Sequence, residues 1–283
     1  MEQTLEAGPI TRARTEYVKR FSLSQRMEHL AIMITFTGLA ITGLPQKYAG
    51  AALSQWLIIH MGGIELTRLI HRILSFIFTA GALYHAGIIF VSIARHQFRP
   101  NIFFSFRDYR DAIAVLRYDL GISDKHPEFD RFDFRQKFEY WGIVFGGIIM
   151  LVSGYFLMFP IFFTRILPGQ AIPVAKIFHS YEGLMAFLVI IIWHLYGAHL
   201  EPDKFPGDTT IFTGKISRER MQKEHSLEYE RIVREERERD EVMNCDTLLK
   251  FRVHDLRITL HEIFCEVSMI TGSSLEELTK RNE

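Results

Sequence analysis

Residues 179–199 read HSYEGLMAFLVIIIWHLYGAH, a nearly continuous apolar segment with histidines near both of its ends. With its neighbours it forms an apolar span from residue 177 to residue 198, and this span contains no lysine or arginine. A helix of about 20 apolar residues is long enough to cross the roughly 30 Å hydrocarbon core of a membrane. We therefore expect this segment to be a transmembrane helix.

Three further apolar spans have the same character, and none of them contains lysine or arginine. They cover residues 27–44, 73–94 and 140–163. The mean hydropathy of the whole chain is only +0.07, because a highly charged tail from Asp203 onward dilutes the apolar spans. The sequence thus predicts an all-α fold, an integral membrane four-helix bundle.

Lysine and arginine are concentrated in two polar segments, and such residues collect on the cytoplasmic side of membrane proteins. The two segments are the connection 95–137 and the residues before the first span, with Arg12, Arg14, Lys19, Arg20 and Arg26. We expect both termini to be cytoplasmic, in a multi-pass protein of a prokaryotic cytoplasmic (inner) membrane. The predicted domains are a cytoplasmic N-terminal segment (1–22), the four-helix bundle (23–202) and a cytoplasmic helical tail (203–283).

Two polar regions are candidates for contacts outside the bundle. The connection 95–137 mixes charged and aromatic residues, which predicts either a short amphipathic helix at the membrane surface or a partner-docking surface. The tail has few helix breakers from 217 to 243, and its apolar segment 248–270 needs burial. We expect this tail to dock a soluble redox partner. Nothing in the composition indicates a nucleic-acid partner, and we find no internal repeat.

Histidine is the residue type that can hold a cofactor in this chain. The two cysteines, Cys245 and Cys265, form no metal-binding or haem-attachment motif. Five of the 12 histidines lie within or at the margins of the apolar spans: His29, His71, His85, His179 and His194. Because a polar ring in hydrocarbon is costly unless it is paired, these histidines are functional candidates.

Their spacing places imidazoles near both sides of the membrane. His71 and His85 are 14 residues apart on one helix, and His179 and His194 are 15 apart on another. A low-spin haem iron takes two axial ligands on opposite faces of its ring, and neutral imidazole is well suited to iron. The pattern predicts two stacked b-type haems, with His71 facing His179 near the outer side of the membrane.

The inner site has more candidate ligands than one iron can use. His29 lies at a height comparable with those of His85 and His194, so either His29 or His85 pairs with His194. The remaining histidine would serve a quinone, a haem propionate, or a third haem together with His199. The sequence alone leaves these alternatives open.

Three charged residues beside these histidines are further candidates. Arg26 and Arg72 lie at helix ends, where they would either neutralise haem propionates or anchor the helices at the membrane interface. Glu182 follows His179 by one helical turn. It would hydrogen-bond an imidazole N–H, accept a proton from a quinol, or face interfacial water.

Four stretches of the chain together resemble the cytochrome b subunits of membrane-bound formate dehydrogenases, nickel–iron hydrogenases and thiosulfate reductases. They are RMEHLAIMITFTGLAITGL, HRILSFIFTAGALYHAG, KFEYWGIVFGGIIMLVSG and HSYEGLMAFLVIIIWHLYGAHLEPDKFP. The resemblance covers roughly residues 20–210. It implies an electron-transfer subunit rather than a complete enzyme, joining a partner with iron–sulfur clusters, c-type haems or a catalytic metal to the menaquinone or ubiquinone pool.

The resemblance also implies a particular set of haem ligands. It carries over to His29, His71, His179 and His194, with His71 and His179 on the outer haem and the other two on the inner one. This sequence departs from the formate dehydrogenase pattern by the additional His85 and by one extra residue between the fourth-helix histidines. The competing hypothesis is a haem-free membrane anchor or transporter whose histidines relay protons or bind a metal.

Overall fold

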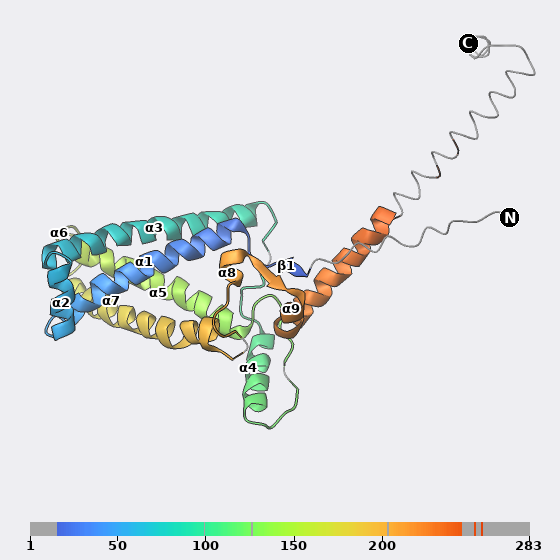
Figure 1. The fold of residues 1–283 in the computed structure, drawn as a ribbon. Helices are drawn as coiled ribbons and strands as arrows, with labels where there is room; N and C mark the ends of the chain where they lie inside the picture. Colours follow the sequence, from blue (N-terminus) through green and yellow to red (C-terminus); the bar gives the residue numbers. More distant parts are fainter. Residues whose placement is uncertain are drawn as a thin grey trace, which may run out of the picture. The chain divides into compact units, whose positions relative to one another are not determined.

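Four long helices form the body of the molecule (Figure 1). The computed structural model describes residues 16–98, 100–125, 127–202 and 204–244, together with Arg252 and Leu256. The long helices are α1 (Leu23–Lys47), α3 (Ile64–Ala94), α5 (Phe134–Met158) and α7 (Ala171–Leu188), the last continued by the π-helical segments η1 (Val189–His194) and η2 (Tyr196–Leu200). All four are long and apolar enough to cross a membrane. The predicted all-α fold with four transmembrane helices is confirmed.

The helices differ in length from the apolar spans that predicted them. Helix α3 begins at Ile64, nine residues before the predicted span. The helical backbone hydrogen bonds extend over polar residues, which a prediction based on apolar residues alone does not include. Helix α5 ends at Met158, and Pro160 begins a separate short helix, α6 (Pro160–Phe163). Proline has no backbone N–H to continue a helix but suits a first helical turn.

Capping boxes fix the starts of α1 and α5. The Ser22 side chain accepts a hydrogen bond from the Gln25 backbone N–H, and the Gln25 side chain accepts one from the Ser22 backbone N–H. Asp133 and Gln136 make the same reciprocal pair at the start of α5. Each box satisfies backbone groups that the first turn of a helix leaves without partners.

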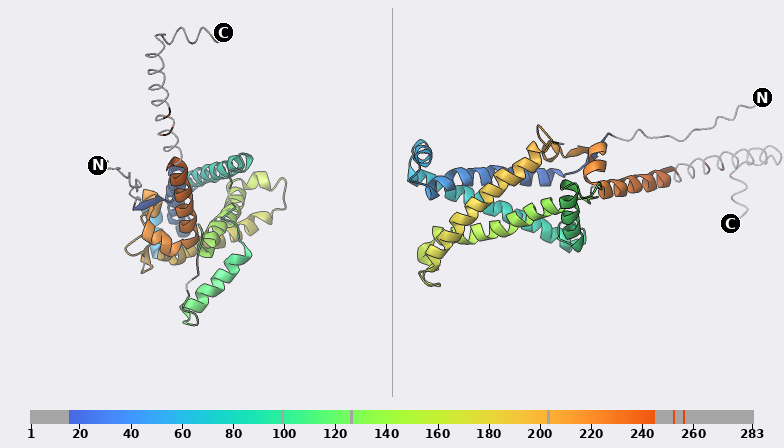
Figure 2. Two further views of the ribbon diagram at one scale, coloured as in Figure 1. Left: turned by 90° about the vertical axis from the view of Figure 1, so that its right-hand side faces the viewer. Right: turned by 90° about the horizontal axis from the view of Figure 1, so that it is seen from below.

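The long helices associate as two pairs, α1 with α3 and α5 with α7 (Figure 2). Close approach within each pair depends on small residues. A Cβ added to Gly38 of α1 would lie 2.7 Å from Leu74 of α3, and one added to Gly183 of α7 would lie 3.2 Å from Met150 of α5. Large apolar side chains cover the outside of the bundle, as a lipid-facing surface requires.

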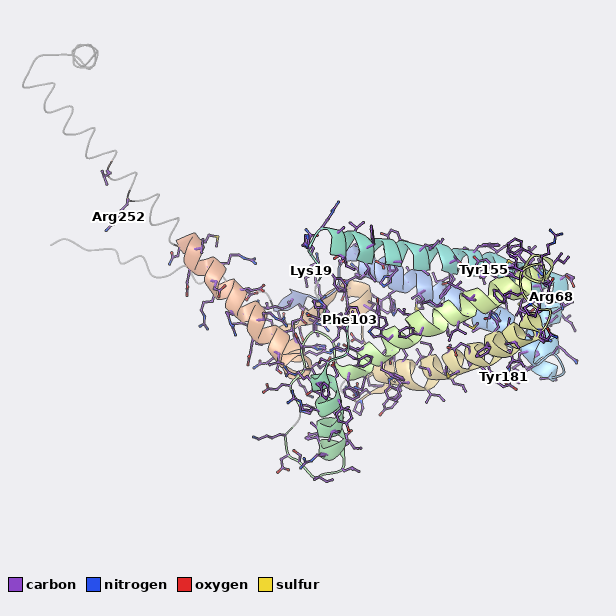
Figure 3. The ribbon with its side chains drawn as sticks, turned by 180° about the vertical axis from the view of Figure 1, so that it is seen from behind. Lys19, Arg68, Phe103, Tyr155, Tyr181 and Arg252 are labelled. Atoms are coloured by element: carbon purple, nitrogen blue, oxygen red, sulfur yellow. The ribbon has the colours of Figure 1, made fainter. Side chains whose placement is uncertain are left out.

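The two ends of the bundle have different structures. One end carries α2 (Ala52–His60) and α6, whereas the other gathers strand β1 (Tyr17–Lys19), helix α8 (Thr210–Thr213), strand β2 (Lys215–Ser217) and helix α9 (Arg218–Glu224) (Figure 1). Figure 3 shows Arg68, Tyr155 and Tyr181 at the first end and Lys19 and Phe103 at the second.

Antiparallel pairing joins the segment before the first long helix to the segment after the last. Strands β1 and β2 pair with Tyr17 opposite Ser217 and Lys19 opposite Lys215. Four crossings return the chain to the side from which it started, so both segments emerge at the same end of the bundle. We call it the inner end, and its cytoplasmic location remains a prediction from the distribution of lysine and arginine.

Helix α4 (Phe106–Asp119) lies crosswise to the long helices at the inner end (Figure 1). A buried ion pair between Asp108 and Lys137 of α5, 2.7 Å long, fastens it there. Burial alone would raise the pKa of Asp108, but hydrogen bonds from Lys137 and Ser105 hold that pKa below its usual value. The carboxylate therefore stays charged and α4 stays attached to α5.

The compact unit that contains the bundle extends to Ser226, and residues from Leu227 onward form a second unit. Helix α9 and residues 226–244 agree with the helix expected from 217 to 243, with a break at His225. Apart from Arg252 and Leu256, the apolar segment 248–270 lies outside the described residues.

Candidate functional site

The outer half of the bundle brings two histidines face to face. His71 of α3 and His179 of α7 have ring centroids 6.2 Å apart, with the ring planes at 80°. They come from different helix pairs, so their meeting depends on how the two pairs pack against one another. Two imidazoles at this separation can hold a metal centre between them.

Hydroxyl groups fix the tautomer of both rings. The Thr42 hydroxyl donates to the carbonyl of Gly38 (2.7 Å), so its oxygen accepts from Nδ1–H of His71 (2.8 Å). The Ser153 hydroxyl donates to the carbonyl of Ile149 (2.6 Å) and accepts from Nδ1–H of His179 (3.1 Å) in the same way. Because each proton resides on Nδ1, each Nε2 lone pair is left for a ligand bond.

A glycine next to each hydroxyl makes room for the ring. A Cβ on Gly43, which follows Thr42, would lie 3.1 Å from Cε1 of His71. A Cβ on Gly154, which follows Ser153, would lie 3.1 Å from Cε1 of His179. Such contacts are tighter than side chains normally make, so any larger residue would displace the imidazole.

The inner half of the bundle brings together His29 of α1 and His194 of η1. Their ring centroids are also 6.2 Å apart, with the ring planes at 38°. Nδ1–H of His194 donates to the carboxylate of Glu139 on α5, at 2.9 Å, which again leaves Nε2 for a ligand bond. His29 has no hydrogen-bonding partner within the described part of the chain.

His85 belongs to a different group of hydrogen-bonded side chains. Its Nδ1 donates to the Glu28 carboxylate (2.7 Å), and its Nε2 lies 3.0 Å from the Tyr140 hydroxyl. Both ring nitrogens are thus engaged. The structure places His29, and not His85, opposite His194.

The two helix pairs repeat one another in their contacts. In each pair the first helix carries a glutamate that holds the inner histidine of the second helix and, 14 residues later, a hydroxyl that holds the outer one. The members are Glu28, Thr42, His71 and His85 in α1 and α3, and Glu139, Ser153, His179 and His194 in α5 and the fourth helix. Gly43 and Gly154, which follow the two hydroxyl residues, also occupy equivalent positions.

The π-helical segment η1 accounts for the one irregularity in this repeat. The histidines of α3 are 14 residues apart, whereas those of the fourth helix are 15 apart. A π-helical turn holds one more residue than an α-helical turn. The extra residue is absorbed between Val189 and His194, so His194 faces α5 as His179 does.

The repeat also identifies equivalent positions across the bundle. His29 follows Glu28 and faces His194 of the other pair, whereas Tyr140 follows Glu139 and faces His85. The inner level therefore has two related sites, one with two imidazoles and one with an imidazole and a phenol.

The remaining candidates lie apart from the histidine pairs. Arg26 donates to the carbonyl of Phe212, and its Nε is buried with no partner among the described residues. Arg72 is exposed. The carboxylate of Glu182 packs on Gly146 of α5 and makes no hydrogen bond to a described histidine.

His199, the alternative ligand for a third haem, faces no second histidine in the described structure. Its ring packs at the turn after the fourth helix, where a Cβ on Gly207 would lie 2.8 Å from its Nδ1. The structure therefore groups four histidines into two pairs and leaves His85 and His199 outside them.

The sequence of the chain is similar to those of known cytochrome subunits. The chain is 26% identical over 190 residues to the formate dehydrogenase cytochrome b556(fdo) subunit of Escherichia coli K12, covering 65% of this chain and 80% of that subunit. It is 21% identical over 228 residues to the nitrate-inducible formate dehydrogenase cytochrome b556(Fdn) subunit of the same strain, covering 81% and 97%. The family model for prokaryotic cytochrome b561 matches residues 20–204, so the chain belongs to the prokaryotic cytochrome b561 family.

Proposed function

We propose that this membrane cytochrome b, a protein of electron transfer, carries electrons between a redox partner complex and the quinone pool. It would hold two b-type haems, an outer one bound by His71 and His179 and an inner one bound by His29 and His194. The observation that carries the proposal is the pair of 6.2 Å separations between facing imidazoles.

The residues of both pairs fit a haem iron. An iron bound at about 2 Å by the inward nitrogens of two imidazoles sets the ring centres roughly 6 Å apart. In three of the four rings Nδ1 is tied to an oxygen acceptor of this chain, so Nε2 is the free nitrogen. When bound, each haem supplies a one-electron redox centre.

Cationic side chains at both levels suit haem propionates. The buried Nε of Arg26, one turn before His29, has a donor without a partner in the described part of the chain. Arg72 follows His71 and is exposed. Each would neutralise a propionate by a charge-assisted hydrogen bond.

The site formed by Glu28, His85 and Tyr140 suits the head group of a quinol. Because Nδ1–H of His85 donates to Glu28, Nε2 is an acceptor, and the Tyr140 hydroxyl donates a hydrogen bond to it. A quinol offers the same kind of hydroxyl group. The His85 side chain is 41% exposed, and added Cβ atoms at Gly87 and Gly142 would meet nothing within 4 Å. A ring could therefore reach it from the lipid.

The relatives named above are subunits of formate dehydrogenases. We propose that this chain likewise serves a redox complex, in the inner membrane of a prokaryote, whose other subunits carry iron–sulfur clusters, c-type haems or a catalytic metal site. The exchangeable substrate would be menaquinone or ubiquinone.

A visible spectrum of the purified protein tests the haem assignment. We expect sharp reduced α-bands of b-type haem and two haems per chain by pyridine haemochrome analysis. A colourless preparation would contradict the proposal and support the haem-free anchor or transporter.

Replacing Tyr140 by phenylalanine tests the quinol site. The substitution removes the hydroxyl that occupies Nε2 of His85 in the absence of quinol, so the KM for a quinol analogue should fall roughly fivefold, with both haems retained. Tyr155→Phe is the matched control, because Tyr155 also lies on α5 but bonds Thr79 at the outer end. Equal effects of the two substitutions would place the quinol elsewhere.

A further inference from the structure

Helix α4 exposes an apolar face. Its large apolar side chains recur every three or four residues and are 41–88% exposed; they are Phe106, Tyr109, Ile113, Leu116 and Leu120, the last just beyond the helix end. At 100° per residue they lie on one side of the helix. Asp108 lies about a third of a turn away from this face and is buried against Lys137. The apolar face is thus exposed rather than packed on the bundle.

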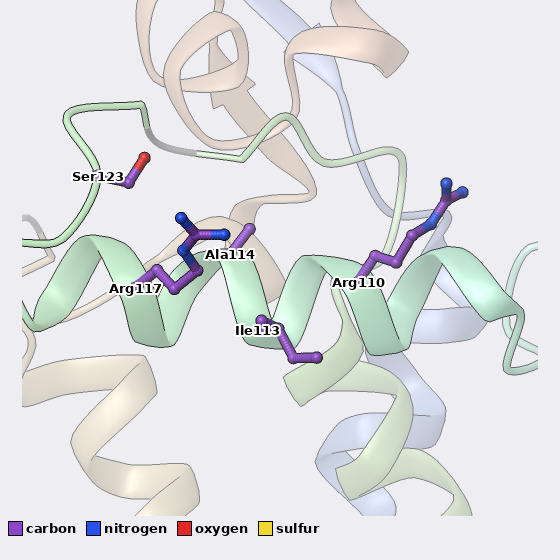
Figure 4. Close-up of a pocket in the computed structure, with 5 residues that line it drawn as sticks. All are labelled: Arg110, Ile113, Ala114, Arg117 and Ser123. Carbon is purple, nitrogen blue, oxygen red and sulfur yellow. The ribbon is translucent and has the colours of Figure 1, made fainter.

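A pocket with two arginines borders this face. It has a volume of ≈ 360 Å³ and lies between α4 and the residues that follow it, lined by Arg110, Ile113, Ala114, Arg117 and Ser123 (Figure 4). Arg110 and Arg117 are two helical turns apart and extend from the same side of α4. Within the described residues, neither guanidinium makes an ion pair or a hydrogen bond.

Ser123 adds a third donor. Its hydroxyl oxygen accepts a hydrogen bond from the backbone N–H of Lys125, at 3.3 Å, so its O–H is left to donate. Two guanidinium groups and a hydroxyl suit the oxygens of a phosphate group. The pocket therefore has the chemistry of an anion site.

The position of α4 identifies the source of the phosphate. The helix lies crosswise at the inner end of the bundle (Figure 1). An amphipathic helix beside the end of a transmembrane bundle suits the level of the lipid head groups. In Figure 4, Ile113 extends toward the side of α4 on which the transmembrane helices continue, whereas Arg110 and Arg117 extend the other way. An in-plane membrane helix has this distribution, with apolar side chains in the acyl region and cations among the head groups.

We propose that α4 lies in the inner leaflet and that the pocket formed by Arg110, Arg117 and Ser123 binds the phosphate of an anionic phospholipid. The adjoining apolar face would contact the acyl chains of the same lipid. A free phosphate ion would leave that face uncovered. A lipid accounts for both the charged pocket and the apolar side chains beside it.

The test is native mass spectrometry of the full chain in detergent, titrated with short-chain phosphatidylglycerol or phosphatidylcholine. The wild-type protein should bind phosphatidylglycerol more tightly than phosphatidylcholine. The double substitution Arg110→Gln/Arg117→Gln should weaken phosphatidylglycerol binding about 30-fold. Each of the two cations contributes a comparable amount to the free energy of binding an anionic lipid. Arg107→Gln is the matched control, because Arg107 is already paired with Asp111 at 3.5 Å.

Three results would overturn the proposal. Equal binding of the two lipids by the wild-type protein would show that the pocket does not recognise net charge, and this comparison depends on no variant. Displacement of the lipid by millimolar inorganic phosphate would identify a small-anion site. Loss of partner subunits from the double variant, with lipid binding unchanged, would identify a protein-docking surface.

Discussion

Replacing His71 or His179 by alanine should remove the outer haem and retain the inner one. The outer haem iron would lose one of its two proposed ligands, while the inner pair, His29 and His194, is unchanged. The haem-to-protein ratio should fall by about half. One of two midpoint potentials should disappear from a redox titration of either variant.

His60→Ala is the matched control for this experiment. His60 also lies at the outer end, in α2, but its ring stacks on Trp56 and its Nδ1 lies 2.8 Å from the carbonyl of that residue. This variant should keep both haems. Loss of both haems from His71→Ala without general unfolding, or loss of neither, would refute the assignment of His71 and His179 to one iron.

At the inner level, His29→Ala should leave one haem whereas His85→Ala should leave two. His29 faces His194 at a separation that suits an iron, while both nitrogens of His85 are hydrogen-bonded to Glu28 and Tyr140. The His85 variant should instead lose affinity for a quinol. Haem quantification and low-temperature electron paramagnetic resonance of low-spin iron would measure the first effect, and steady-state quinol oxidation the second.

The opposite result would assign the inner ligand to His85. A His85→Ala protein with one haem and a His29→Ala protein with two would mean that the Glu28–His85 hydrogen bond breaks when haem binds. Haem loss from both variants would indicate a third cofactor. Glu28→Gln offers a further control, because it keeps the shape of the side chain while removing the charge beside His85.

The transmembrane helices could be predicted from the sequence because the membrane imposes a local rule. Hydrocarbon offers no hydrogen bonds to the backbone, so an apolar span of about 20 residues must satisfy its own amide groups as a helix. Residues 27–44, 73–94, 140–163 and 177–198 meet this rule whatever their neighbours are. The exact ends of the helices depended on Pro160 and on polar turns, and a prediction from apolar residues alone does not take these into account.

The candidate histidines could also be identified from the sequence, since an imidazole in hydrocarbon requires a partner. Which histidine faces His194 could not be predicted from the sequence. His29 and His85 lie at similar heights, and only the packing of α1 and α3 directs Glu28 toward His85 and His29 toward the opposite pair. Neighbouring residues of a helix point about 100° apart, so the rotation of α1 about its axis decides whether His29 or Glu28 faces the opposite pair.

The sequence by itself determined that this chain has four helices long and apolar enough to cross a membrane, with imidazoles near both ends of the bundle, because helix length and residue polarity are properties of single segments. Only the tertiary structure decided which imidazoles meet, how η1 restores the orientation of His194, and that the two helix pairs repeat the same hydrogen bonds. Those features depend on rotations and contacts between helices that are distant in sequence, and no local pattern of residues encodes them.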